Sequence, residues 1–243
     1  MEGIKRYRIK KNGEVTDKRL SLLALLVGGS IRKLGAVLAA MVLVETVLFT
    51  VAAQNGSGME STLYNRLAYG VFLVALGLIF ILLAHLEGVM GTKGGDTLRR
   101  LKLTGRDIFL VEAGYNFLCL VFVLIIQIWI AILAVKVWGG SAGKSTQGLF
   151  LAFYRIEFLH CLLPMQEIGK WLRNLLLLFA LSLGAARGFW ERDYVLPVLV
   201  FLITALWFNS GIGWNFTDFA CILTYLLEVA EAVWLVWKYK KEA

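Results

Sequence analysis

Long stretches without charged side chains constrain this chain more than any other feature. Six such runs lie along its 243 residues, and several approach the ~20 residues that cross a hydrocarbon core. The chain is 59% hydrophobic and 17% charged, against ~45–50% and ~25% in an ordinary soluble domain. This excludes a small secreted disulfide scaffold, a disordered chain and a soluble enzyme with one small core. The runs are Val37–Ala53, Leu67–Leu86, Ile108–Val135, Leu175–Ala186, Tyr194–Phe208 and Phe219–Trp237.

The runs predict an all-α polytopic membrane protein with about six transmembrane helices. Six spans of ~20 residues take up ~120 positions, and the remaining segments are too short for a second domain of ~100 residues. We therefore expect residues 1–243 to form a single transmembrane domain. Because the first 20 residues are highly charged, we expect no cleavable signal peptide.

Basic residues divide unequally between the two sides of this arrangement. With the N-terminus in the cytoplasm, 19 of the 25 Lys and Arg residues fall on the cytoplasmic side and 6 on the other. Cytoplasmic loops carry an excess of Lys and Arg, so this division predicts a multi-pass protein of the cell membrane with both termini cytoplasmic. The same placement explains the net charge of +8. We therefore expect the lipid bilayer, and not nucleic acid, as a partner.

The N-terminal segment 1–34 does not fit the spans. Its part Asp17–Leu34 is basic at both ends and has an apolar centre of about eleven residues, too short to cross a bilayer. We expect a helix that lies in the inner interface and runs into the first span.

The segment 148–167 is a second exception. It is apolar but carries Arg155, Glu157 and His160 in its middle, and a further crossing there would make the number of spans odd. We expect an amphipathic or re-entrant element on the outer face, with Pro164 ending its helix.

Two local patterns suggest chemistry, and neither is convincing. Gly143-Lys144-Ser145-Thr146 resembles the end of a phosphate-binding loop, but Trp138 stands where that loop needs a glycine. Glu157, His160 and Cys161 share a helix face and suit a metal, yet hydrogen-bonded interfacial side chains are the simpler interpretation. With no HExxH or G-x-S-x-G motif in the chain, we expect neither enzymatic activity nor a metal or cofactor site.

Polar side chains lie inside the predicted spans, where a charged group costs ~2.5–3.5 kcal/mol on insertion scales. Glu228 and Glu231 share a helix face, and Asn116 and Gln127 lie on one side of the third span. We expect such groups to line a cavity or a subunit seam. The alternative is hydrogen bonding between helices or, for Glu112 and Glu231, closeness to the inner interface. The set comprises Glu45, Glu112, Asn116, Gln127, Glu228 and Glu231.

The connection 88–107 has the form of a docking helix. A capping residue opens a short helix with leucines on one side and basic residues on the other, and Gly105 ends it just before the third span. We expect its leucines to contact a cytoplasmic partner; the alternative is an interfacial helix that touches only lipid headgroups. The predicted docking residues are Asp96, Thr97, Leu98, Arg99, Arg100, Leu101, Lys102 and Leu103.

The segment DTLRRLKLTGRDIFLVEAGYNF, within Gly91–Phe117, resembles the coupling region of ABC transporter permease subunits. The six-span plan, the interfacial N-terminal helix and the extra outer element resemble the type-2 exporter permeases of bacterial drug and peptide efflux systems. The resemblance implies a permease that pairs with a second copy or a homologous permease. It also implies a separate cytoplasmic ATPase on each coupling helix, with ATP and Mg bound on that partner and no cofactor on this chain.

Other classes of function remain open. An accessory or structural membrane protein, such as an assembly factor or sensor, would use the basic helix to hold a partner or anionic lipid. A secondary transporter is disfavoured because the six short spans lack evident inverted repeats and Gly/Pro-broken helices. A membrane enzyme is the least favoured class because the chain has few polar side chains that could act in catalysis. Co-purification of an ATPase separates the permease from all of these.

Overall fold

The computed structural model describes residues 2–54, 62–85, 103–141, 156–164, 167–191, 194–209 and 213–242. Every regular element within these ranges is a helix. The helices are α1 (Glu2–Gln54), α2 (Thr62–Ala84), α4 (Gly105–Ser141), α6 (Glu157–Leu162), α7 (Ile168–Glu191), α8 (Val195–Trp207) and α9 (Phe216–Glu242).

Five of these helices are long and apolar enough to cross a membrane. Their outward faces carry large hydrophobic side chains such as Leu43, Phe122 and Val233, as expected where lipid surrounds the bundle and backbone polar groups are satisfied within helices. The protein is therefore an all-α polytopic membrane protein, which confirms the predicted fold class. By length and composition, the candidate spans are Asp17–Val51, Arg66–Ala84, Gly105–Ala134, Ile168–Gly188 and Phe216–Lys238.

The predicted fifth span, Tyr194–Phe208, forms the shorter α8, which has 13 residues. At 1.5 Å per residue its length is about 20 Å, less than the ~30 Å of a hydrocarbon core. Pro197 is tolerated in the first turn because the N–H groups there have no acceptor within the helix. α8 packs against α7 and α9 and runs antiparallel to α7, since Pro197 near its start lies beside Gly184 and Phe208 at its end lies beside Arg173.

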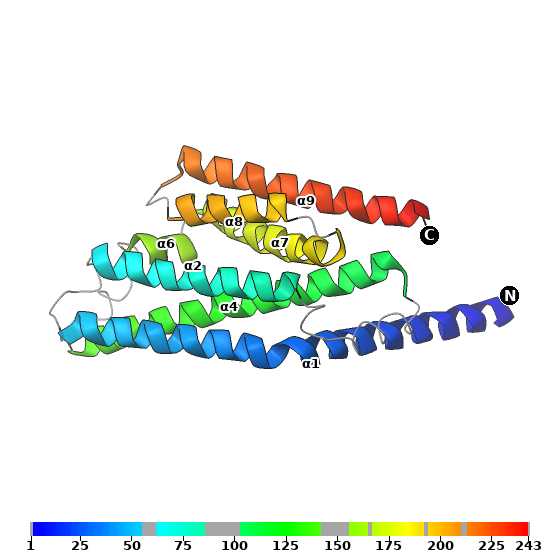
Figure 1. Ribbon diagram of the computed structural model, residues 1–243, viewed down its shortest axis with the longest axis horizontal. Coiled ribbons are helices and arrows are strands. Elements are labelled where there is room, and N and C mark those ends of the chain that lie inside the picture. Colours follow the sequence, from blue (N-terminus) through cyan, green and yellow to red (C-terminus); the bar gives the residue numbers. More distant parts are fainter. Residues whose placement is uncertain are drawn as a thin grey trace.

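The long helices run side by side along the long axis of the molecule (Figure 1). α1, α2 and α4 pack together, α7 packs on α2 and α4, and α9 packs on α7 and α8. Both termini lie at one end, here called the terminal end, and α6 lies near the opposite, distal end (Figure 1). Five spans alone would leave the termini at opposite ends of the bundle; they lie at one end because α8 runs back along α7 and returns the chain to the distal end, where α9 begins. The side of the membrane on which they lie stays a prediction.

The segment Asp17–Leu34 continues into the first span without a break, as part of α1. Its apolar face is buried within the bundle through Leu22 and Leu26, and Ser30 hydrogen-bonds with the Tyr115 hydroxyl on α4. This face therefore packs on protein. Whether the segment also lies in the inner interface stays a prediction.

Within the predicted outer element 148–167, the structure describes residues 156–164 and Glu167, and these contain the short helix α6. Phe158 packs between Tyr69 and Phe72 of α2, with ring centroids 5.6 Å apart in both pairs. The helix ends before Pro164, as expected from the backbone restriction that a proline imposes on the preceding residue. α6 is thus held against the distal end of the bundle by buried aromatic contacts.

Candidate functional site

The structure buries several of the polar residues predicted to lie in the spans, and it brings some of them together. Glu45 on α1 and Gln127 on α4 are both buried, and Gln127 Nε2 donates a hydrogen bond to Glu45 Oε2 at 2.9 Å. The two residues are 82 positions apart in sequence. Their contact joins the first and third spans inside the membrane-spanning part of the bundle, where no water competes for it.

Glu112 and Asn116 of α4 are also buried. They lie one helical turn apart, and Asn116 Nδ2 donates to the backbone carbonyl of Ser182 on α7, at 3.4 Å. α4 and α7 form one of the main contacts of the bundle. Asn116 therefore acts as an interhelical link, in agreement with the alternative of hydrogen bonding between helices.

Glu228 and Glu231 of α9 have different surroundings although they share a helix face. The Glu228 side chain is fully buried and the Glu231 side chain is 56% exposed. Both contact Arg187 of α7: its Nη1 atom lies 3.7 Å from Glu228 Oε2 and forms an ion pair with Glu231. We call these three residues the Arg187 cluster. Arg187 is thus a buried span residue, not a loop residue as the charge pattern indicated.

Gly184 makes the burial of Glu228 possible. A Cβ atom at this position would lie 3.2 Å from Glu228 Oε1 and 3.0 Å from Pro197 of α8. A larger residue would have to push the neighbouring helices apart. The glycine therefore lets α7, α8 and α9 meet closely beside the buried carboxylate.

A second polar cluster, at the distal end, was not predicted from the sequence. Arg173 of α7 and Asp218 of α9 form an ion pair in which both side chains are fully buried. Asn174 Nδ2 donates to the Cys161 carbonyl of α6 at 2.8 Å, and the Arg173 guanidinium lies 4.6 Å from the centre of the Phe208 ring. This pair ties α6, α7, α9 and the end of α8 together.

Glu167 extends this distal cluster just outside the membrane-spanning segment of α7. Its carboxylate lies 3.1 Å from Lys170 Nζ and 3.2 Å from His160 Nε2, and it accepts the Gly213 backbone N–H at 2.9 Å. Partial burial by itself would raise the pKa of the Glu167 carboxyl. The hydrogen bonds from Lys170, Gly213 and His160 outweigh this and lower that pKa below its ordinary value.

The count of basic residues places Lys170 and Arg173 on the outer side, because they lie between the third and fourth predicted spans. The signal that identifies them as partners of a buried cluster is Asp218, an acid at the start of the last apolar run on the same predicted side. Opposite charges at neighbouring span ends are expected to pair, since a lone buried charge is costly. Sequence alone does not say which spans are neighbours.

Most of the predicted docking helix, Asp96–Lys102, lies outside the described residues. Its last member, Leu103, is half-buried and packs against the main apolar core. Thr104 then caps α4: its hydroxyl accepts the Asp107 backbone N–H at 3.2 Å and donates to the Asp107 carboxylate at 2.6 Å. Asp107 also forms an ion pair with Arg19 of α1. The chain therefore enters α4 through a junction that is fixed to α1.

Glu157, His160 and Cys161 do not form a metal centre. The Glu157 side chain is exposed, whereas His160 and Cys161 are buried, and His160 contacts Glu167 instead. Among the described residues, no group of three or more His, Cys, Asp or Glu side chains converges on a point.

No family model, curated protein sequence or solved structure matches this chain. The fold and the buried polar clusters define its class: a multi-pass membrane protein whose spans are joined by paired polar groups in the interior. A particular family does not follow from these findings, so function is argued below from the geometry.

Proposed function

We propose that this chain is a permease subunit of an ATP-driven ABC transporter of the exporter class, with ATP hydrolysis on a separate cytoplasmic subunit. The resemblance of the segment within Gly91–Phe117 to a coupling region is the starting point for this proposal. The structure adds a physical route for the force that such a region has to transmit.

The junction after the predicted docking helix carries the proposal. Leu103 packs on the core, Thr104 caps α4 and Asp107 pairs with Arg19 of α1. A displacement of the preceding segment would therefore move α1 and α4 together, because both helices are anchored at the same place. Helix shifts are one way in which a local displacement reaches the rest of a fold, and a contact shared by two helices suits the coupling of ATP hydrolysis to rearrangement of the spans.

The substrate path in this proposal runs between two permease chains. Glu45 contacts Gln127, Arg187 contacts Glu228 and Arg173 contacts Asp218. Two described cavities, which flank α1, are lined mainly by apolar residues. A polar path through a single chain would have to break these pairs. A path between a chain and its second copy or homologue leaves them intact, which agrees with the expected dimer.

The same interior supports the alternative, an accessory or structural membrane protein. Buried ion pairs on both halves of α7 hold the bundle in one arrangement, as suits a rigid subunit that assembles with other membrane proteins. In that case the basic segment 88–107 would hold a partner or anionic lipid without transmitting force.

Purification of the full chain in mild detergent distinguishes the two. The permease proposal expects a Mg-dependent ATPase to co-migrate with the chain in a fixed ratio and to recover the chain when the ATPase itself is tagged. If the chain is instead recovered with other membrane subunits and without ATPase activity, the accessory function replaces the permease.

A further inference from the structure

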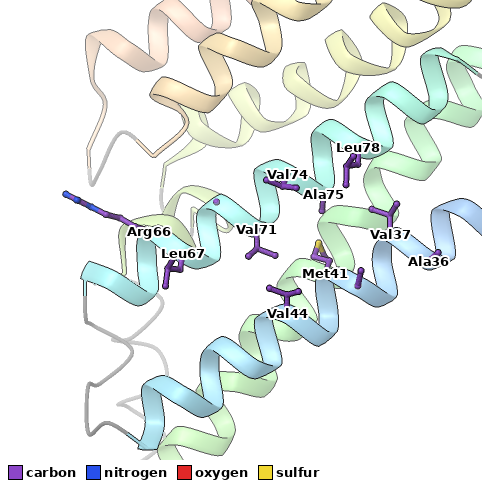
Figure 2. A pocket seen from close by; sticks show the side chains of 12 residues that line it. Ala36, Val37, Met41, Val44, Arg66, Leu67, Val71, Val74, Ala75 and Leu78 are labelled. Carbon is purple, nitrogen blue, oxygen red and sulfur yellow. The ribbon is translucent and has the colours of Figure 1, made fainter.

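An apolar groove opens between α1 and α2 on the lipid-facing side of the bundle. Its volume is about 600 Å³. Met41 and Ala75, both buried, form its floor, and Val44, Val74 and Leu78 stand exposed along its rims. Figure 2 shows Met41 and Val44 of α1 facing Val71 of α2 across it.

The length of the groove matches one leaflet of a bilayer. Along α2 it extends from Arg66 to Leu78, about 18 Å at 1.5 Å per residue. Half of a ~30 Å hydrocarbon core is about 15 Å. Arg66 begins the membrane-spanning segment of α2, so the groove lies in the leaflet on the distal side.

The width of the groove suits a chain and not a helix. A volume of about 600 Å³ spread over about 18 Å gives a mean cross-section of about 33 Å². A helix with a diameter of ~10 Å needs ~80 Å². Small residues on both walls, Ala36 and Ala40 of α1 and Gly70 of α2, leave this narrow space open.

A positive charge stands at the distal mouth of the groove. The Arg66 side chain is exposed and points away from the groove, beyond the end of its apolar walls (Figure 2). A guanidinium at the edge of a hydrocarbon layer lies at the level of lipid headgroups and binds phosphate well. The groove therefore has an apolar slot for a hydrocarbon chain and a cation where the headgroup of that chain would lie.

We propose that this groove is a binding site for one acyl chain of an anionic phospholipid, whose headgroup contacts Arg66. The α1–α2 wall holds the chain and Arg66 selects the negative headgroup. A basic residue near a membrane surface favours anionic lipid by about fivefold. This site does not depend on whether the chain is a permease or an accessory subunit.

The test is photolabelling in vesicles. The purified full chain is reconstituted in phosphatidylcholine vesicles that contain a minor fraction of either phosphatidylglycerol or phosphatidylcholine with a photoactivatable group in the acyl chain. Labelled peptides are then located by mass spectrometry. We expect labels to concentrate in peptides that contain Val44 and Val71, with phosphatidylglycerol labelled about fivefold more than phosphatidylcholine.

Two substitutions test the two parts of the site. Gly70→Leu fills the groove, and since no atom lies within 4 Å of a Cβ built at Gly70, the helix accepts it; Ala40→Leu fills it from the other wall. Either should abolish labelling of the groove by both lipids. Arg66→Gln should keep the labelling and remove the preference for phosphatidylglycerol.

Gly114→Leu is the matched control. Gly114, like Gly70, is a helical glycine with no atom within 4 Å of its Cβ position, and it is exposed on α4 outside the groove, so this substitution should leave groove labelling unchanged. Groove labelling that stays at the native level in both Gly70→Leu and Ala40→Leu would overturn the proposal. So would equal labelling of the native chain by the two lipids, or efficient disulfide formation between two copies that carry Val71→Cys, which would assign the groove to a second copy.

Discussion

Arg173 of α7 and Asp218 of α9 form a fully buried ion pair across 45 residues of sequence. The pair lies at the distal end, beside the Cys161 carbonyl of α6 and the Phe208 ring at the end of α8. Four helices thus meet around one guanidinium. Such a pair is expensive to break from one side, because the remaining charge stays buried without its counter-ion.

The first prediction follows from this pair. Asp218→Ala should lower the free energy of unfolding by about 3–5 kcal/mol, measured as loss of helical signal in a denaturant titration in detergent micelles. The joint change Arg173→Met with Asp218→Leu should restore most of that loss, since it removes both charges and leaves apolar side chains in their place. A single variant as stable as the native chain would mean that the pair does not hold α7 to α9.

The Arg187 cluster gives a second prediction. Glu228→Leu should leave the chain inserted and folded, because Glu231 still pairs with Arg187; if Glu228 lines a cavity or subunit seam, transport or assembly should change. Arg187→Leu should cost about 3–5 kcal/mol because it removes the cation that lies 3.7 Å from the buried Glu228 carboxylate.

Glu231→Gln is the control for the Arg187 cluster, since the side chain is largely exposed and such pairs contribute about 0–1 kcal/mol. Thermal unfolding in detergent and assembly on a sizing column measure these effects. Normal function and assembly of the Glu228→Leu and Glu231→Gln double variant would assign both residues to structure alone.

Glu167 predicts a dependence of stability on pH. Because hydrogen bonds lower its pKa in the folded chain, its carboxylate stabilises the fold at pH values above the ordinary glutamate pKa of ~4.3. This contribution is lost as the pH falls through the lower folded-state value. Melting temperatures of the native chain and of Glu167→Gln should therefore differ near pH 7 and converge only at pH values below the lowered folded-state pKa of Glu167. A constant difference across this range would contradict the assignment.

The topology predicted from the basic residues is tested by cysteine labelling in intact cells. With the native cysteines replaced, a cysteine introduced between residues 140 and 148 should react with an impermeant reagent, and one near residue 12 should react only after the cells are opened. Lys170, Arg173 and Arg187 are buried in ion pairs within α7, so these three residues do not count as loop charges. Reaction near residue 12 in intact cells would reverse the orientation.

The docking prediction tests the proposed function most directly. Leu98→Asp with Leu101→Asp should abolish association with the ATPase, because apolar anchors dominate such contacts. Arg99→Gln should only weaken it and increase its sensitivity to salt, since charges at the rim of an interface mainly affect rate and specificity. Recovery of the ATPase at the native level by the double leucine variant would show that the helix is not the docking site.

The sequence by itself determined the class of the fold. Uncharged runs of ~20 residues leave only a helix as the way to satisfy backbone hydrogen bonds in lipid, so α1, α2, α4, α7 and α9 follow from composition along the chain. It also identified Glu45, Gln127 and Glu228 as residues that need a partner in the interior, because a polar group in a span is costly.

Only the tertiary structure decided which partners these residues have. Periodicity places Gln127 on a face of its own helix, but the contact with Glu45 depends on how α1 and α4 are packed. For the same reason the sequence did not show that Arg173 and Lys170 are paired. Arg173 pairs with Asp218 of α9, and Lys170 pairs with Glu167, which precedes α7. Hydropathy predicted a span over Tyr194–Phe208, and the structure shows a helix of 13 residues there, α8. Hydropathy reports how apolar a segment is and carries no information on which helix lies beside it.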